Sequence, residues 1–192
     1  MDLKEIIDQT YKVEPEAFEE ALKYVEYFKF NKGDILIKQD EVCKYLYIIG
    51  AGVLRNYVIN KKGEDHTRWF AEDGDLFTSL LSFKNGEPSI ASVEALCNGY
   101  GWKILIEDAW YLINSYKDWS LWAVHLFSDG LAVMERRYKY LGVGDAYTRF
   151  CNMYKWRRAE VIMHIPLQHI ASYLGVTPQS VSRFRRRYIK EL

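Results

Sequence analysis

The chain has 192 residues, of which 49% are hydrophobic and 27% charged, and its 26 Lys and Arg balance 26 Asp and Glu. This length allows one or two domains, and the apolar content is sufficient for a packed core. The chain has no apolar run long enough to span a membrane and its N-terminus is acidic, which argues against a membrane partner or a secretory signal and favours a cytoplasmic protein.

The first predicted element is an amphipathic helix over residues 15–28. Pro15 suits the first turn of a helix, where its missing N–H has no cost. Apolar residues then recur at steps of three or four, which places them on one helix face: Phe18, Leu22, Val25 and Phe28. The pattern predicts a surface helix with one buried side.

From Phe30 onward the periodicity changes to that of β-strands. Short runs rich in β-branched and aromatic residues follow one another, at residues 35–37, 45–49, 53–59, 67–70, 90–96 and 101–106. Turns rich in Gly, Asp, Asn and Lys separate the first runs, at residues 31–34, 50–52, 60–63 and 72–75. Many short strands at regular spacing predict a sandwich or a roll.

A long helical pattern extends from Asp118 to Leu141 and carries two apolar stripes. One stripe consists of Ala123, Phe127, Gly130, Met134, Tyr138 and Leu141. The other consists of Trp122, Leu126 and Val133. A surface helix of a monomer needs only one apolar face, so two stripes favour packing on the β domain on one side and on a partner on the other. A single broad core face is the alternative.

Residues 165–187 contain two short helical patterns on either side of Gly175, which is the layout of a helix-turn-helix. Glycine accepts the positive φ that a sharp helix exit requires. Thr177 is a good N-cap and Pro178 suits the first helical position, so the second helix is expected to begin at Pro178. The apolar seam between the two helices is formed by Ile170, Leu174, Val181 and Phe184.

The second helix of this pair carries groups that suit DNA. The side chains expected to meet base edges, where Arg suits guanine and Gln suits adenine, are Gln179, Ser180 and Arg183. Those expected to meet phosphates are Gln168, Thr177, Arg185, Arg186 and Arg187. Residues 149–192 hold nine basic and two acidic side chains, a net of +7, whereas the rest of the chain carries −7. A helical hairpin with a solvated basic tail is the alternative.

Other chemistry finds little support in the sequence. Cys43, Cys97 and Cys151 are widely spaced and form no C-x-x-C motif, which argues for free structural thiols and against a metal site or another cofactor. The P-loop, G-x-S-x-G and H-E-x-x-H motifs do not occur. A cupin-type metal centre needs several His, and the β region contains only His66. We therefore expect no enzyme.

Residues 165–187 resemble the helix-turn-helix of Crp/Fnr transcriptional regulators, especially the Bacteroidetes-type members, through IASYLG, the Thr-Pro pair and SRFR. The turns at residues 32–34, 50–52 and 74–75 resemble those of the family's cyclic-nucleotide-binding β-roll. The resemblance implies an α+β fold, with a β-roll or double-stranded β-helix sensor domain and its N-terminal helix over residues 1–113. The roll is expected to be followed by a dimerisation helix over 114–141 and by an all-α helix-turn-helix domain over 142–192.

The resemblance also implies how the protein acts. The family binds pseudo-palindromic double-stranded DNA as a homodimer, and RNA polymerase is a further partner that the resemblance allows. In the family, the base contacts come from positions that correspond here to Pro178, Gln179 and Arg183. Arg183 matches the family arginine, whereas Gln179 replaces a common glutamate. We therefore expect an operator that differs from that of the best-known members.

The sensor pocket departs from the family pattern. Family members that bind a cyclic nucleotide hold the ribose with a Gly-Glu pair and the phosphate with an Arg-Ser or Arg-Thr pair. Thr78 and Ser79 stand at the first pair of positions, and Ser89 and Ile90 stand at the second. The degenerate pocket is therefore expected to be lined by Thr78, Ser79, Leu80, Ser89, Ile90 and Ala91.

Loss of the glutamate and the arginine removes a charged hydrogen bond and leaves a buried phosphate unpaired. We therefore expect no cyclic nucleotide binding by the family mode, and either an unknown small-molecule effector or none. A substitute cation is the alternative, with Arg55, Arg68 and Lys84 as candidates. The competing function is a non-catalytic dimeric effector-binding or scaffold protein whose basic tail binds an acidic protein partner.

Overall fold

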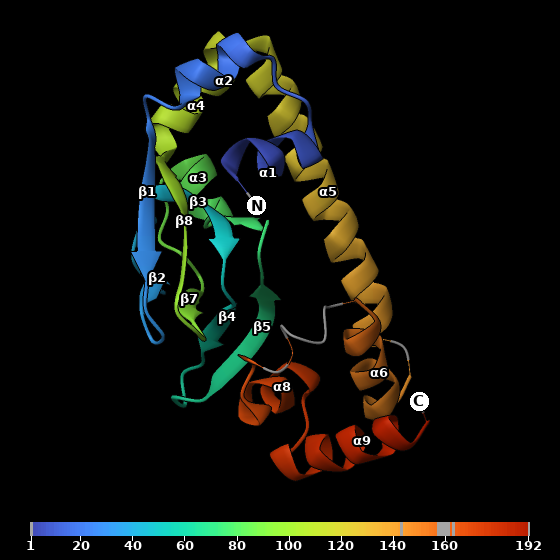
Figure 1. Ribbon diagram of the computed structural model, residues 1–192. Coiled ribbons are helices and arrows are strands. Elements are labelled where there is room, and N and C mark those ends of the chain that lie inside the picture. Colours follow the sequence, from blue (N-terminus) through green and yellow to red (C-terminus); the bar gives the residue numbers. More distant parts are fainter. Residues whose placement is uncertain (1, 143, 157–161, 163, 192) are drawn as a thin grey trace.

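The computed structural model describes residues 2–142, 144–156, 162 and 164–191 of the chain (Figure 1). The helices are α1 Leu3–Thr10, α2 Pro15–Ala21, α3 Leu80–Asn85, α4 Ile106–Ser115, α5 Lys117–Gly142, α6 Ala146–Trp156, α8 Leu167–Leu174 and α9 Pro178–Glu191. The strands are β1 Val25–Phe30, β2 Ile35–Ile37, β3 Tyr45–Ala51, β4 Leu54–Ile59, β5 Asp65–Ala71, β6 Leu76–Phe77, β7 Ser92–Ala95 and β8 Gly99–Leu105.

The strands form two four-stranded antiparallel sheets that face each other as a β-roll. One sheet has the order β1-β8-β3-β6 and the other β2-β7-β4-β5. Between them lies an apolar core that includes Phe30, Ile49, Leu54, Phe77 and Val93. The predicted α+β fold with an N-terminal roll, a long helix and C-terminal helices is confirmed.

The N-terminal prediction was wrong in part, because the helix that begins at Pro15 ends at Ala21. Residues 25–30 form strand β1, which pairs with β8 over six residues. The spacing of Val25 and Phe28 fits a helix, but the ladder offered by β8 is a contact between distant parts of the chain that local periodicity does not register. An additional helix, α1, begins with a capping box between Asp2 and Glu5.

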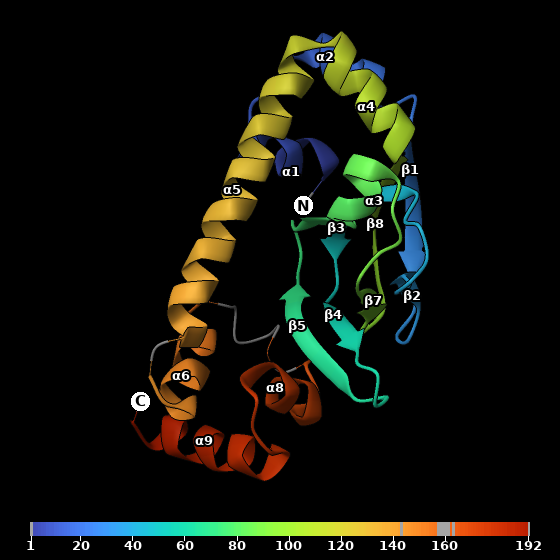
Figure 2. The same ribbon diagram turned by 180° about the vertical axis from the view of Figure 1, so that it is seen from behind.

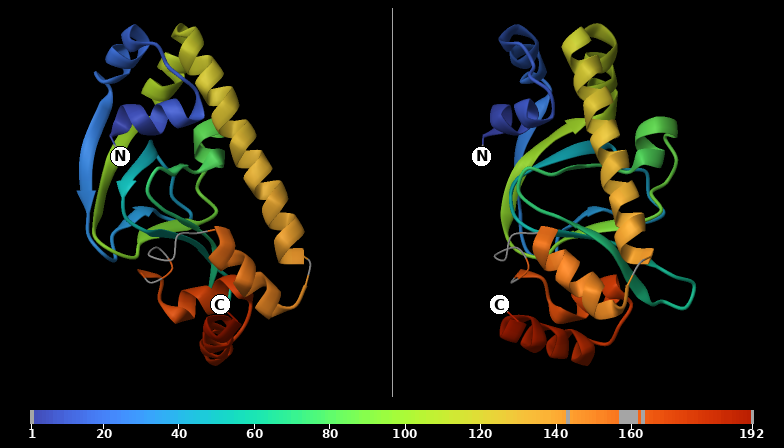
Figure 3. Two further views of the ribbon diagram at one scale, coloured as in Figure 1. Left: turned by 45° about the vertical axis from the view of Figure 1, so that its right-hand side comes forward. Right: turned by 90° about the vertical axis from the view of Figure 1, so that its right-hand side faces the viewer.

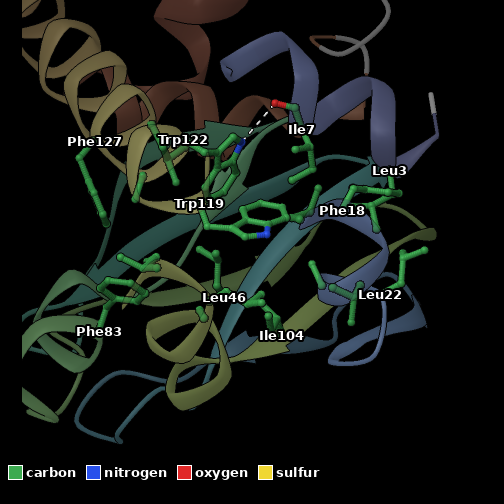
Figure 4. Close-up of a pocket in the computed structure, with 18 residues that line it drawn as sticks. Leu3, Ile7, Phe18, Leu22, Leu46, Phe83, Ile104, Trp119, Trp122 and Phe127 are labelled. Atoms are coloured by element: carbon green, nitrogen blue, oxygen red, sulfur yellow. Dashed lines mark hydrogen bonds between the residues drawn. The ribbon is translucent and has the colours of Figure 1, made fainter. Parts of the chain in front are cut away.

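Helix α5 covers one side of the roll in its first half and then diverges from it, as Figure 2 shows from behind. Trp119, Trp122 and Ala123 are buried in a core shared with α1, α2 and α4. The indole N–H of Trp119 donates to Ala17 O at 2.9 Å and that of Trp122 to Ile7 O at 3.1 Å. Figure 4 shows these indoles in the closed apolar interior, which leaves a void of about 40 Å³.

Helix α5 exposes several apolar side chains, most of them in its second half. Leu131 is 67% exposed, and Val124, Val133, Met134 and Tyr138 are also exposed. The two predicted stripes therefore do not separate into a roll side and a partner side along the whole helix. Both stripes are buried near the N-terminal end of α5, and most of the exposed apolar side chains lie nearer its C-terminal end. The side chain of Leu141 is outside the described part.

The C-terminal helices form a separate small core beneath the roll (Figure 3). Phe150 of α6, Ile170 of α8 and Val181 of α9 are fully buried together. Val53, Phe70 and Leu96 of the roll belong to the same core, so α8 is packed directly on the sheet that contains β5. Within the described ranges, no helix has the length and apolar character that crossing a membrane requires.

Candidate nucleic-acid surface and effector cavity

The turn between α8 and α9 has the geometry that its sequence predicts. Gly175 has φ 67°, in the left-handed region. The N–H of Val176 donates to Ala171 O at 3.0 Å, which closes the end of α8. Thr177 Oγ1 accepts from the Ser180 N–H at 3.3 Å, and α9 begins at Pro178 as expected. The buried residues Ile170, Leu174 and Val181 hold the helices together.

Three predicted base-contacting residues lie together at the N-terminal end of α9. Gln179 and Arg183 are exposed and one helical turn apart, so they share a face. Arg183 Nη2 donates to Ser180 Oγ at 3.1 Å, and that hydroxyl lies 3.1 Å from Thr177 Oγ1. The result is a cluster of amide, hydroxyl and guanidinium groups on α9, which lies across the lower end of the molecule beneath α6 and α8 (Figure 1).

The predicted phosphate-contacting residues are divided by the structure. Gln168, Thr177 and Arg186 are exposed. Arg185 is half-buried and its Nε donates to the Tyr154 hydroxyl of α6 at 3.1 Å. Arg187 Nε donates to Glu191 at 2.7 Å, and its guanidinium lies 3.9 Å from the centre of the Tyr147 ring. Arg185 and Arg187 therefore already have partners within the protein.

A cavity of about 800 Å³ lies between the roll, α5 and α8. Its walls include all six residues of the predicted pocket, which the loop before α3 and the segment before β7 bring together: Thr78, Ser79, Leu80, Ser89, Ile90 and Ala91. Leu126, Phe127, Met134 and Tyr138 of α5 and Tyr173 of α8 complete the walls. The roll, the long helix and the C-terminal unit thus meet at one cavity.

The polar groups at the predicted pocket positions are largely committed to the protein itself. Thr78 Oγ1 donates to Tyr45 O at 2.9 Å, and Ser89 Oγ donates to Ala91 O at 2.7 Å. Ser79 accepts from the Ser82 N–H and caps α3. No Asp or Glu occurs among the described residues that line the cavity. The described walls therefore offer no carboxylate, and the hydroxyls of Thr78 and Ser89 are already bonded to the backbone.

Of the three candidate substitute cations, only Arg68 lines the cavity. Lys84 is exposed on α3 and does not reach the walls. Arg55 is on the opposite face of β4 and is only 3% exposed. The sequence did not indicate a further cation in the walls, Arg137 of α5, because its partners are distant in the chain.

Arg55 is buried and connects the roll to α8 through a network of ion pairs and hydrogen bonds. Its guanidinium donates two hydrogen bonds of 3.1 Å to Asp65 and one of 2.7 Å to Glu94. Its Nη1 also donates to His169 Nδ1 of α8 at 2.6 Å. Because a guanidinium has no acceptor, this bond requires a neutral imidazole with its proton on Nε2. The contact holds residues that are 114 positions apart.

A further hydrogen bond joins α8 to the roll, and the surroundings of His169 change its pKa. Ser172 Oγ accepts from the Thr67 N–H at 2.9 Å, which joins α8 to the edge of β5. Burial first, and then the adjacent Arg55 guanidinium, lower the pKa of His169 to about 4, although Asp65 acts in the opposite direction.

Comparison with known proteins agrees with this architecture. Residues 27–116 match the model of the cyclic nucleotide-binding domain family. No curated protein sequence matches the chain. Among solved structures, FixK2 from Bradyrhizobium japonicum is similar, with a TM-score of 0.72, 20% identity, and coverage of 87% of this chain and 85% of that one.

Two further solved structures are similar over nearly the whole chain. The c-di-GMP responsive global regulator CLP of Xanthomonas campestris has a TM-score of 0.72 at 12% identity, covering 93% of both chains. A protein assigned to the Crp/Fnr family from Eubacterium rectale has a TM-score of 0.69 at 17% identity, covering 93% of this chain and 85% of that one. The chain thus contains a cyclic nucleotide-binding domain match and has the fold of Crp/Fnr regulators.

Proposed function

We infer that the protein is a homodimeric, DNA-binding transcriptional regulator of Crp/Fnr type. The observation that carries this conclusion is the polar cluster at the start of α9, with Gln179 and Arg183 exposed and Ser180 half-buried, on a chain with the fold of such regulators. The Bacteroidetes type, with α8 and α9 as a helix-turn-helix, is part of the same proposal and rests on the IASYLG and Thr-Pro motifs.

In this proposal α9 lies in the major groove. Gln179 and Arg183 contact base edges because they are exposed on one face near the helix start, and the half-buried Ser180, which accepts from Arg183, contacts bases beside them. Gln168, Thr177 and Arg186 contact phosphates. Arg185 and Arg187 first have to leave Tyr154 and Glu191 to do so, which makes their contribution smaller than sequence alone suggests.

The exposed apolar side chains of α5 support dimerisation. A monomer gains nothing from exposing Val124, Leu131 and Val133 to water, whereas a two-fold contact between copies of α5 buries them. A two-fold dimer also presents two α9 helices to successive turns of DNA, which corresponds to a pseudo-palindromic operator.

The cavity supports the loss of cyclic nucleotide binding by the family mode. The positions of the family's ribose- and phosphate-binding residues carry Ser79, Ser89 and Ile90, and no carboxylate lines the described walls. Occupation of this cavity by an effector is proposed to change the contacts of α5 and α8 and thereby the spacing of the α9 helices. The protein acts as a regulator and not as an enzyme.

Selection of bound DNA from a random duplex pool, followed by titration of the selected sequence at several salt concentrations, tests this function. We expect a palindromic consensus and a steep loss of affinity with salt, with a slope of about −0.9 per phosphate contacted. Failure to enrich any sequence, with no binding even at low salt, would refute the proposal. Salt-sensitive capture of an acidic protein without DNA binding would support the scaffold function instead.

A further inference from the structure

The cavity between the roll, α5 and α8 has one end that is charged and polar. Arg68 and Arg137 both line it, together with the amide of Asn56. No side-chain partner of Arg68 occurs within the described part of the chain. Arg68, in described walls that hold no carboxylate, favours an anionic group at this end of a ligand.

A β-bulge places Arg68 at this position. Asn56 of β4 is opposite Trp69, but Tyr57 is opposite Thr67, so Arg68 is the extra residue of β5. A bulge re-aims the side chain that it contains and releases its backbone groups from the ladder. The carbonyl oxygen of Arg68 instead accepts a hydrogen bond from the Arg137 guanidinium. Roll and long helix are thus joined at the charged end of the cavity.

Asn56 is an unusual residue for the interior of the roll. It is 8% exposed, and it lies on the same strand face as the fully buried Leu54. Its Oδ1 is buried and has no hydrogen-bond partner in the described structure. A buried unpaired amide oxygen costs free energy, which a ligand that donates a hydrogen bond removes.

The rest of the cavity is apolar. Leu46, Phe77, Leu126 and Phe127 form walls that suit a hydrocarbon. Leu46, Leu126 and Phe127 also line the closed void of the neighbouring core, so the hydrophobic end of the cavity adjoins further apolar space (Figure 4). The hydroxyls of Thr78 and Ser89 already donate to backbone carbonyls, so they leave few partners for the many polar groups of a nucleotide.

We propose that this cavity binds an apolar carboxylic acid that bears a hydroxyl group. The carboxylate pairs with Arg68, the hydroxyl donates to Asn56, and the hydrocarbon occupies the walls formed by Leu126 and Phe127. The inference deepens the proposed function, on which it rests, by giving the chemical class of the effector. Such a ligand touches the roll and α5 at once, and Tyr173 places α8 at the same cavity.

Isothermal titration of the full chain with decanoic acid, 3-hydroxydecanoic acid and decan-1-ol tests the proposal, with cyclic AMP and cyclic GMP as competitors. We expect the hydroxy acid to bind about tenfold more tightly than decanoic acid, and decan-1-ol to bind more weakly than either. Arg68→Gln should weaken binding of decanoic acid at least about tenfold and leave decan-1-ol unchanged. Lys84→Gln, a cation outside the cavity, should change neither.

Asn56→Ala should abolish the advantage of the hydroxy acid over decanoic acid, and a thermal melt of each variant confirms that it is folded. Equal affinity for acid and alcohol, full affinity in Arg68→Gln, or tighter binding of a cyclic nucleotide overturns the proposal. Since these titrations contain no DNA, their failure leaves the DNA-selection experiment intact. Failure of that selection likewise refutes the regulator function without touching the ligand class.

Discussion

Arg55 is the residue on which the contact between the β-roll and α8 depends most. It is buried, and its guanidinium donates to two carboxylates and an imidazole. The Asp65 side chain is 40% exposed and that of Glu94 is 19% exposed, so solvent screens part of the charge that removal of Arg55 leaves unpaired. We expect Arg55→Ala to lower the free energy of unfolding by roughly 1–3 kcal/mol, measured by urea denaturation. A loss no larger than that of the exposed Lys84→Ala would contradict this assignment.

His169 makes the same junction sensitive to pH. Its pKa falls from 6.5 to about 4 on folding, so the unfolded chain binds more protons between these values. The stability that the neutral imidazole contributes is complete above about pH 6.5 and is lost as the pH falls toward 4. The full effect is about 3 kcal/mol.

Urea unfolding between pH 4 and 7.5 measures this slope, and His169→Asn provides the matched control. Asn retains an acceptor for Arg55 but does not titrate in this range, so the variant should lose the part of the slope that belongs to His169. Identical slopes in the two proteins would show that His169 is not the titrating group.

Arg183 and Arg186 test the division between base and phosphate contacts on α9. Arg183→Ala should weaken binding to the selected operator by roughly 1–3 kcal/mol and relax the preference at one base position. Arg186→Ala should weaken all sequences alike and reduce the salt slope by about one contact. Binding assays on the operator and on single-base variants separate the two effects, and identical behaviour would contradict the division.

At the scale of elements, the α8–α9 turn depends on one backbone conformation. A Cβ added at Gly175 meets no atom within 4 Å, so the only cost of a side chain there is its left-handed φ. We expect Gly175→Ala to lower the free energy of unfolding by about 1–2 kcal/mol, and the melting temperature should fall with it. Gly175→Asn should recover much of the loss, because Asn tolerates this region. Equal stability of the Ala variant would show that the turn has relaxed to another conformation.

Elements also show where local patterns are ambiguous. The spacing of Phe18, Leu22, Val25 and Phe28 fits one helix, but the chain divides it into α2 and β1. Six residue pairs with β8 stabilise β1, and none of them is visible within a local window. The strands β4 and β5 pair with each other across a short turn, and the predicted runs at residues 53–59 and 67–70 found both of them.

At the scale of the whole molecule, the exposed apolar side chains of α5 are the proposed contact between two copies of the chain. Leu131→Glu places a charge in the proposed contact between two copies, and should convert a dimer into monomers and reduce operator binding. Sedimentation equilibrium measures the change. Val42→Glu, at an exposed apolar residue in a loop of the roll, is the control and should remain a dimer. An unchanged dimer in Leu131→Glu would place the interface elsewhere.

The sequence by itself determined the features that are governed by near neighbours. Gly175, Thr177 and Pro178 specify the α8–α9 turn, and the alternation of short strands specifies the roll, because caps, turns and pleats act over a few residues. Six residues were also expected at the pocket through the resemblance to a known β-roll, and all of them line the cavity: Thr78, Ser79, Leu80, Ser89, Ile90 and Ala91.

Only the tertiary structure decided which distant groups meet. It buries Arg55 between Asp65, Glu94 and His169 and places Arg137 beside Arg68. It also leaves apolar side chains of α5 exposed, Leu131 among them. These outcomes depend on how the roll, α5 and α8 pack together, and a packing contact between residues 69 or 114 positions apart leaves no periodicity in the sequence.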